Sequence, residues 1–193
     1  PVQWAGFHGD PETGNTVIQM TPGLDAGPVL GVQPIAIDPE ETAEQLETRM
    51  AELGATLTLE VVDQLAAGTT RPVAQDTSLA TKAPRLSKAM GHIDWSRSAQ
   101  QIKNQVRALQ PWPVAFTSWQ RAEPVRLQIH QVQTVAYGGE AAAGTVVASG
   151  ESLVIATGQG GLRLDVIQPA GKRAMQASDF LRGTPIPCGA RME

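Results

Sequence analysis

The chain has 193 residues, of which 15 are Lys or Arg, 19 are Asp or Glu and 41% are hydrophobic, giving a formal net charge of −4. This length and apolar content support a globular core in one large or two modest domains. No apolar run approaches the roughly 18 residues of a helical membrane span, which disfavours a membrane protein. The single cysteine, Cys188, allows no internal disulfide. It is expected to be a spectator thiol in a reducing, cytoplasmic compartment.

The charge is distributed unevenly along the chain. Residues 1–81 carry two basic and twelve acidic side chains, a formal charge of −10, whereas residues 82–193 carry thirteen basic and seven acidic ones, a formal charge of +6. A basic half of this size suits a polyanion such as RNA, because each phosphate contact releases condensed counterions. The alternative is a solvated surface that is rich in arginine but binds nothing charged.

Two β-rich stretches, residues 15–20 and 29–37, flank a segment dense in glycine and proline. They predict a strand, a shaped loop and a second strand. The next residues are typical of a helix start, since Asp38 can cap the helix, Pro39 suits its first position and Glu41 stands three residues after the cap. We therefore expect the helix to begin at Asp38.

Apolar residues then recur at steps of three and four and end at Gly68, which predicts one apolar helical stripe. The stripe consists of Leu46, Met50, Leu53, Leu57, Val61 and Leu65. Gly54 lies in its middle and costs roughly 1 kcal/mol relative to Ala, so the segment is expected to be either two helices or one bent helix. Residues 72–84 show no sustained period and predict a linker at a domain boundary.

The second half predicts one helix followed by short strands. The helix begins near Ser96, carries its apolar residues at Ile102, Val106 and Leu109, and stops before Pro111. Five β-rich stretches follow, at residues 114–119, 125–132, 144–148, 153–157 and 162–167. This order and size favour a small antiparallel barrel of the OB type. A last helical turn is expected at residues 177–181.

Asp25 is a candidate acid/base residue, because it lies in the predicted loop between Gly23 and Gly27, where glycines let a ligand approach the backbone. The alternative is that Asp25 only closes a turn. The histidines His8, His92 and His130 lack metal-ligand spacing, so no metal site is expected.

The aromatic residues around the predicted helix end, Trp95, Trp112, Phe116 and Trp119, favour packing over base stacking. The basic residues of the linker and of the following helix are candidates for phosphate contacts. They are Arg85, Lys88, Arg97, Lys103 and Arg107, together with Lys172 and Arg173 in a predicted loop.

Short segments along nearly the whole chain resemble the methionyl-tRNA formyltransferase family. The end of that family's catalytic domain is similar to Glu-Thr-Gly at 12–14, residues 17–20 and Gly-Leu-Asp-Ala-Gly-Pro at 23–28. Its linker and C-terminal domain are similar to residues 83–88, 93–96, 107–108 and 111–113, Gln-Pro-Ala-Gly-Lys-Arg at 168–173, and residues 179–181. The Leu-Asp-x-Gly element is shared with other folate-dependent formyltransferases, whereas Gln-Pro-Ala-Gly-Lys favours the family that acts on tRNA.

The resemblance implies an α/β fold followed by a β fold. Residues 1–70 would be the C-terminal part of a doubly wound formyltransferase domain, residues 71–88 a linker, and residues 89–193 an OB-like tRNA-binding domain. The implied reaction moves a formyl group from 10-formyltetrahydrofolate, a co-substrate, to the amino group of initiator methionyl-tRNA. No tightly bound cofactor, metal, DNA or membrane partner is implied, and the protein is expected to be a cytoplasmic monomer.

The resemblance also implies roles for individual residues. Asp25 matches the family's catalytic aspartate. The folate pocket would include Thr21, Pro22, Gly23, Leu24 and Asp25, although an acidic residue often stands in the family at the position of Thr21. The tRNA contacts would include Arg85 and Lys88, and we expect Lys172 and Arg173 to join them.

The family's catalytic Asn and His are expected upstream of Pro1, so the 193-residue piece alone is expected to be inactive and poorly stable. Two alternatives stay open. One is a related folate-dependent enzyme that acts on a substrate other than tRNA, and the other is a non-catalytic RNA-binding fragment.

Overall fold

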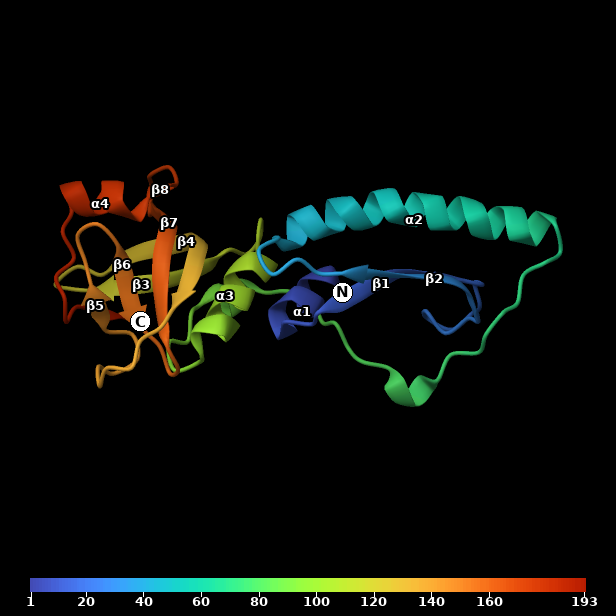
Figure 1. The fold of residues 1–193 in the computed structure, drawn as a ribbon, viewed down its shortest axis with the longest axis horizontal. Coiled ribbons are helices and arrows are strands. Elements are labelled where there is room, and N and C mark those ends of the chain that lie inside the picture. The colour runs from blue at the N-terminus through green and yellow to red at the C-terminus, as the bar shows by residue number, and fades with distance from the viewer.

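The structure is a computed structural model that describes residues 1–193, and it consists of two parts side by side along the long axis (Figure 1). The first part contains a helix, two strands and a long helix: α1 (Val2–His8), β1 (Glu12–Ile18), β2 (Val29–Ala36) and α2 (Ala43–Ala66). The second part contains the helix α3 (Ala99–Ala108) and a curved sheet. None of the helices combines the length and apolarity that a membrane span needs.

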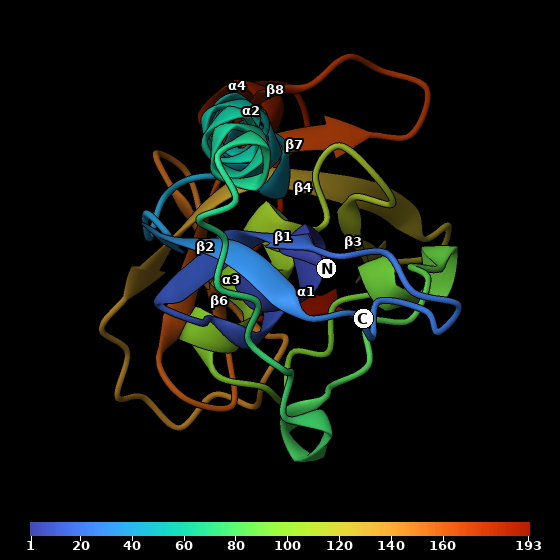
Figure 2. The ribbon, with the colours of Figure 1, turned by 90° about the vertical axis from the view of Figure 1, so that its right-hand side faces the viewer.

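The first part is an antiparallel strand pair covered on one face by α2. The pairing of β1 with β2 runs from Glu12↔Ala36 to Ile18↔Val29, which confirms the predicted strand, loop and strand. Figure 2 looks along α2 and shows this helix above the two strands, with the linker below them. The apolar core here is small and centres on Ile35, Ile37 and Leu46.

The helix α2 continues through Gly54 as a single helix, so the expectation of two helices is wrong. The side-chain amide of Asn15 on β1 lies next to Gly54 and donates to the carbonyl of Met50 at 2.7 Å. A Cβ at position 54 would lie 3.1 Å from that amide nitrogen. The glycine therefore permits a close contact between helix and strand.

The predicted start of α2 at Asp38 is wrong. The helix begins four residues later, at an N-cap formed by Thr42, which exchanges capping-box hydrogen bonds with Gln45. Asp38 and Glu41 form a separate turn, in which the N–H of Asp38 donates to Glu41 Oε1 at 2.7 Å and the Asp38 carboxylate accepts from the N–H of Glu40. Two capping patterns stand in succession, and only the second one leads into the helix.

Residues after α2 form the exposed segment that was predicted as a linker, and they run back along the molecule to the second part (Figure 1). Short 3-10 turns interrupt it at Thr77–Leu79 (η1) and Lys88–Gly91 (η2). The segment is attached to the first part through Gln75, whose side-chain amide donates to the loop between β1 and β2, and at two further points. Val73 forms an antiparallel bridge with Val29, and the indole N–H of Trp4 donates to the carbonyl of Pro84 at 2.8 Å.

The N-cap of α3 lies two residues after the predicted start near Ser96, and the helix ends before Pro111 as predicted. Its N-cap is Ser98, which forms a capping box with Gln101. Ser96 instead donates its hydroxyl to the Asp94 carboxylate at 2.6 Å, in a turn that precedes the helix.

The sheet of the second part is a nearly closed, antiparallel, barrel-like structure. Its strands are β3 (Ala115–Gln120), β4 (Val125–Val135), β5 (Val146–Ala148), β6 (Leu153–Ala156), β7 (Gly161–Pro169), β8 (Met175–Gln176) and β9 (Arg191–Met192), and α4 (Ala177–Gly183) follows β8. The order is β5-β6-β7-β4-β3-β9, with β8 paired to β7. A bridge between Thr145 and Arg191 draws the two ends of the order together.

All five predicted strands of the second part are present, and the predicted last helical turn is α4. The sequence did not reveal α1 or the two-residue strands β8 and β9. The main apolar core of the protein lies inside this part, where 21 buried residues form one cluster.

The helix α3 is the wall that the two parts share. Every residue from Ile102 to Leu109 is buried. Ile102 and Val106 belong to the apolar core of the second part. The opposite face of α3 meets the first part, where Gly6 of α1 packs against Ala108.

Two of the basic residues predicted to contact phosphate are therefore buried in this interface, and that prediction is wrong for Lys103 and Arg107. Lys103 pairs with the Glu40 carboxylate. The Arg107 guanidinium donates to the carbonyls of Asp38 at 3.2 Å and Gly6 at 3.4 Å.

A third candidate, Arg97, also faces the first part, because its guanidinium lies 5.2 Å from the ring centroid of Phe7. Charged groups at a buried helix face need partners, and the first part supplies them to Lys103 and Arg107.

The shared wall leads to a stability prediction. The Ile102→Ala substitution removes a fully buried side chain from the core cluster and should lower the free energy of unfolding by about 2–5 kcal/mol. Urea unfolding followed by circular dichroism measures this loss. Gln100→Ala changes an exposed residue of the same helix and should cost less than about 0.5 kcal/mol. Equal effects of the two substitutions would contradict the burial of α3.

Candidate functional site

The loop between β1 and β2 carries Asp25, and its shape is fixed through the backbone. The side-chain amide of Gln75, on the linker, donates to the carbonyls of Asp25 at 2.8 Å and Gly27 at 2.6 Å. Gly27 is buried so close to the opposite limb that a Cβ there would lie 1.7 Å from the carbonyl oxygen of Gln19. Asp25 itself has a φ of 49°, in the left-handed region. The loop therefore holds its aspartate in a defined and uncommon backbone conformation.

The tip of this loop is open to solvent. Thr21, Pro22, Gly23, Leu24 and Asp25 are all exposed, and Leu24 keeps 93% of its surface. The five main cavities of the molecule include none of these residues. The expected folate pocket is thus not enclosed by residues 1–193.

The loop nevertheless has free groups that a ligand can use. The N–H groups of Gly23, Leu24 and Asp25 donate to no acceptor in the protein. The Asp25 carboxylate forms no ion pair. Backbone donors of this kind suit a planar heterocycle with hydrogen-bonding edges, and a free carboxylate can accept a proton.

An apolar cavity of about 430 Å³ lies behind the loop, between the strand pair and the second half of α2. Met20, the residue that precedes the loop, contributes to its lining. The same residue is 92% exposed overall. The base of the loop is therefore apolar, while its tip offers backbone hydrogen-bonding groups.

The four basic residues expected to contact RNA are all exposed, and none of them has a carboxylate partner. Arg85 and Lys88 lie at the end of the linker and in η2. Lys172 and Arg173 lie in the loop between β7 and β8. Gln168 shapes this second loop, because its side-chain amide donates to the carbonyl of Lys172 at 2.9 Å.

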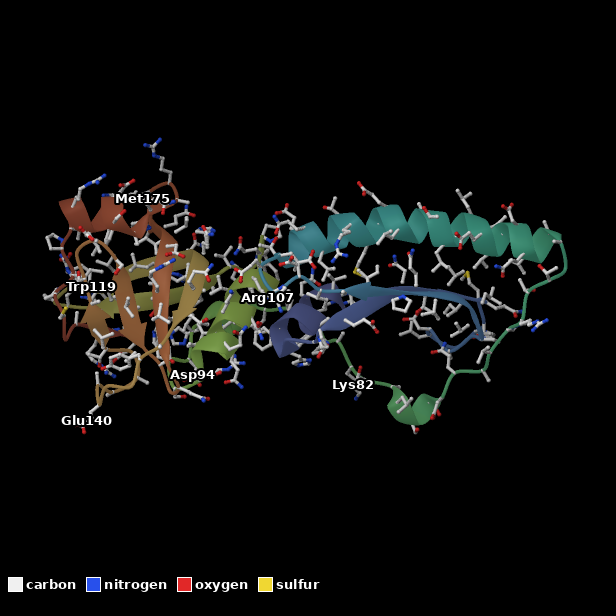
Figure 3. The ribbon with its side chains drawn as sticks, in the orientation of Figure 1. Lys82, Asp94, Arg107, Trp119, Glu140 and Met175 are labelled. Carbon is white, nitrogen blue, oxygen red and sulfur yellow. The ribbon has the colours of Figure 1, made fainter.

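A polar cavity of about 350 Å³ lies where the two parts meet. Lys103, Arg107 and Glu40 line it, and His130 joins them from β4. Figure 3 shows Arg107 at this junction. The charged groups that line this cavity have partners across the contact between the two parts. The cavity therefore results from that contact.

The ion pair at this junction changes the acidity of Glu40. The hydrogen bond from Lys103 lowers the pKa of the Glu40 carboxyl below its ordinary value of 4.5, and Gln133 adds a weaker effect in the same direction. Burial lowers the pKa of the Arg107 guanidinium, and the nearby carboxylates of Glu41 and Glu40 oppose that change.

The aromatic prediction is confirmed for Trp95 and Trp119, which are buried in the core of the second part. The Trp95 indole donates to Thr117 Oγ1 at 3.0 Å. Trp112 does not pack in this way, since it is 51% exposed. Phe116 is half-buried and carries the guanidinium of Arg126 above its ring, a pair that the sequence did not reveal.

No cluster of three or more potential metal ligands occurs among the histidine, cysteine and acidic residues. His130 instead shares a hydrogen bond of 3.0 Å with Gln168, and His92 lies beside Phe116. His8 is an exposed residue at the end of α1, and Cys188 is exposed and free.

Comparisons with known proteins agree with both parts of the chain. Residues 1–62 match the family model described as formyl transferase, and residues 85–185 match that of the formyl transferase C-terminal domain. Methionyl-tRNA formyltransferase of Myxococcus xanthus is 40% identical over 192 residues, which cover 99% of this chain and 60% of that protein. The enzyme of the same name from Gluconobacter oxydans is 42% identical over 193 residues, covering 100% and 60%. The chain thus spans about 60% of the length of these relatives.

Solved structures of lower identity share the fold. HypX from Aquifex aeolicus, in complex with tetrahydrofolic acid, matches with a TM-score of 0.63 and 16% identity over 93% of this chain and 32% of that one. The N-formyltransferase from Helicobacter canadensis, in complex with folinic acid and dTDP-3-aminofucose, matches with a TM-score of 0.64 and 16% identity over 84% and 59%. At these identities the likeness concerns the fold alone.

The junction leads to a prediction about pH. Because the pKa of Glu40 is lowered in the folded state, its carboxylate stabilises the fold above pH 4.5 and loses this contribution as the pH falls through the lowered value. Glu40→Gln should therefore lower the melting temperature at pH 7, and this loss should shrink as the pH is lowered below 4.5. Since the Glu40 side chain is 60% exposed, the effect at pH 7 should stay below about 1 kcal/mol.

Thermal unfolding at the two pH values measures this difference. Glu52→Gln is the matched control, because Glu52 is exposed on α2 and has no ion-pair partner. A loss in Glu40→Gln that does not shrink between pH 7 and pH 3 would count against the ion pair.

Proposed function

The chain belongs to the formyl transferase family, and from this premise we propose that the protein transfers a formyl group from 10-formyltetrahydrofolate to the amino group of initiator methionyl-tRNA. The observation that carries the proposal is the identity of about 40% with methionyl-tRNA formyltransferases over nearly every residue of the chain. The exposed aspartate loop and the unpaired cations of the second part support it, because the reaction needs a proton acceptor and a surface for a polyanion.

We assign the proton transfer to Asp25. When an amine attacks a formyl carbonyl, a tetrahedral oxyanion forms, the amine must lose a proton and the leaving folate nitrogen must gain one. The unpaired Asp25 carboxylate can take up the amine proton, either directly or through a water that it orients. The hydrogen bonds from Gln75 to the carbonyls of Asp25 and Gly27 support this role, because they hold the loop in shape without occupying the carboxylate.

The residues before Asp25 are proposed to contact the folate co-substrate, which supplies the formyl group. Thr21, Pro22, Gly23 and Leu24 would contribute mainly backbone groups, and the free N–H groups of Gly23 and Leu24 support this assignment. The exposed Leu24 side chain would then be covered in the complete site. No tightly bound cofactor and no metal take part in the proposal.

The division of labour follows the proposed domains. Residues 1–70 would belong to the formyltransferase domain, residues 71–88 form the linker, and residues 89–193 form an OB-like domain that binds tRNA. The nearly closed antiparallel sheet supports this last assignment. Arg85, Lys88, Lys172 and Arg173 would contact tRNA phosphates, and the protein would act as a cytoplasmic monomer.

The second candidate function is formyl transfer to a sugar nucleotide. It is favoured by one observation, the fold shared with the enzyme from Helicobacter canadensis, whose structure holds dTDP-3-aminofucose. The identity to that enzyme is 16%, compared with 40% and 42% for the two methionyl-tRNA formyltransferases. We therefore propose tRNA, rather than a sugar nucleotide, as the substrate.

The proposal predicts the effect of Asp25→Asn in the full-length natural protein. With 10-formyltetrahydrofolate and charged initiator tRNA, the kcat should fall by about 10²–10⁴-fold, because the amide cannot accept the proton. The KM for tRNA should change little, since the substitution leaves the cationic surface intact. Asp63→Asn replaces an exposed aspartate of α2 and should leave both constants unchanged.

Two results would contradict the proposal. Unchanged turnover in Asp25→Asn would remove the aspartate from the mechanism. A wild-type protein that formylates a dTDP-amino sugar and ignores charged tRNA would favour the second candidate function.

A further inference from the structure

One outward-facing arginine of the second part is held in place by aromatic contacts. Along β3 and β4 the buried residues alternate with Phe116, Ser118, Arg126 and Gln128, which face outward. The Arg126 guanidinium carbon lies 3.6 Å from the ring centroid of Phe116. The His92 ring packs against the same phenyl group, at a centroid distance of 5.3 Å. The guanidinium is thus fixed by a cation–π contact on a supported ring.

The donors of Arg126 are free. The side chain is exposed, and its guanidinium makes no hydrogen bond and no ion pair within the protein. Glu193 lies on the far side of Ser118, to which it is joined by backbone hydrogen bonds, yet its carboxylates do not reach the guanidinium. Five other arginines donate to protein acceptors: Arg49, Arg107, Arg163, Arg182 and Arg191.

Arg126 also adjoins the loop that carries Lys172 and Arg173. The N–H of Ala170 donates to the carbonyl of Arg126 at 3.2 Å, so the loop leaves β7 beside this residue. Gln168 connects this loop to β4, because its side chain shares a hydrogen bond with His130 and also donates to the carbonyl of Lys172. Arg126 and the loop of Lys172 and Arg173 therefore lie at the same end of strands β4 and β7, and none of the three cations has a carboxylate partner.

The end of the linker also contacts Phe116. The turn η2, which begins with Lys88, packs against β3, and Gly91 lies so close to Phe116 that a Cβ there would be 3.2 Å from the ring. His92 continues this contact through a bridge with Phe116. Arg126 therefore lies beside two segments that carry unpaired cations: the turn that begins with Lys88, which contacts Phe116, and the loop of Lys172 and Arg173, which contacts the Arg126 carbonyl.

We propose that Arg126 binds a backbone phosphate of the tRNA and that Phe116 and His92 are positioning residues for it. The inference rests on the proposed function and extends it to residues that it does not include. A planar guanidinium with free N–H groups matches the two oxygens of a phosphate. A platform that restricts the side chain beforehand lowers the entropy lost on binding, which is why an arginine stacked on an aromatic ring suits this task.

The test is equilibrium binding of initiator tRNA to the full-length protein, measured by fluorescence anisotropy between 50 and 300 mM KCl. Loss of one phosphate contact in Arg126→Gln should raise the Kd about tenfold at low salt and reduce the slope of log K against log salt by about one. Phe116→Leu keeps the charge, so the slope should remain while the Kd rises roughly twofold to fivefold. Phe116→Tyr keeps an aromatic ring, so its Kd for tRNA should equal that of the wild type.

The matched control is Arg191→Gln, which also removes one exposed arginine. The Arg191 guanidinium donates to Thr145 Oγ1 at 2.6 Å and is therefore directed away from the β3–β4 face. Its salt slope should equal that of the wild type. If the wild type binds tRNA and Arg126→Gln keeps the wild-type slope, the inference about Arg126 is wrong and the proposed function stands. If the wild type shows no salt-sensitive binding of tRNA, both are wrong.

Discussion

The arrangement of this protein depends on one helix that is buried on two sides. The apolar face of α3, with Ile102 and Val106, completes the core of the barrel-like part. Its polar face carries Lys103 and Arg107, which are satisfied by Glu40 and by backbone carbonyls of the first part. Removing either part would leave buried charges or apolar surface without partners, so the two parts hold each other in one orientation.

This fixed orientation of the two parts also fixes the positions of the two regions that the proposed reaction requires. The aspartate loop projects from the strand pair, and the unpaired cations lie on the linker and on the second part. The linker contributes to both, because Gln75 shapes the aspartate loop and Lys88 lies in the turn that packs against β3. The linker therefore connects the aspartate loop with the part of the chain that carries the unpaired cations.

The sequence predicts what depends on local patterns. The strands follow from β-rich stretches between turn residues, and the aspartate loop follows from its glycines. The start of α2 does not, since two capping patterns stand in succession and only the second one leads into the helix. The burial of Lys103 and the pairing of Arg126 with Phe116 could not be predicted either, because each depends on elements that meet only in the fold.

Amide hydrogen exchange of α3 tests most directly whether this helix is the shared wall. The amides of residues 102–109 should exchange in the slowest class, together with those of β4 and β7, because exposing them requires both the core and the junction to open. The exposed linker at residues 72–84 should exchange fastest. Exchange of the α3 amides at rates close to those of the linker would contradict the account, since it would mean that α3 opens locally while the rest of the fold stays intact.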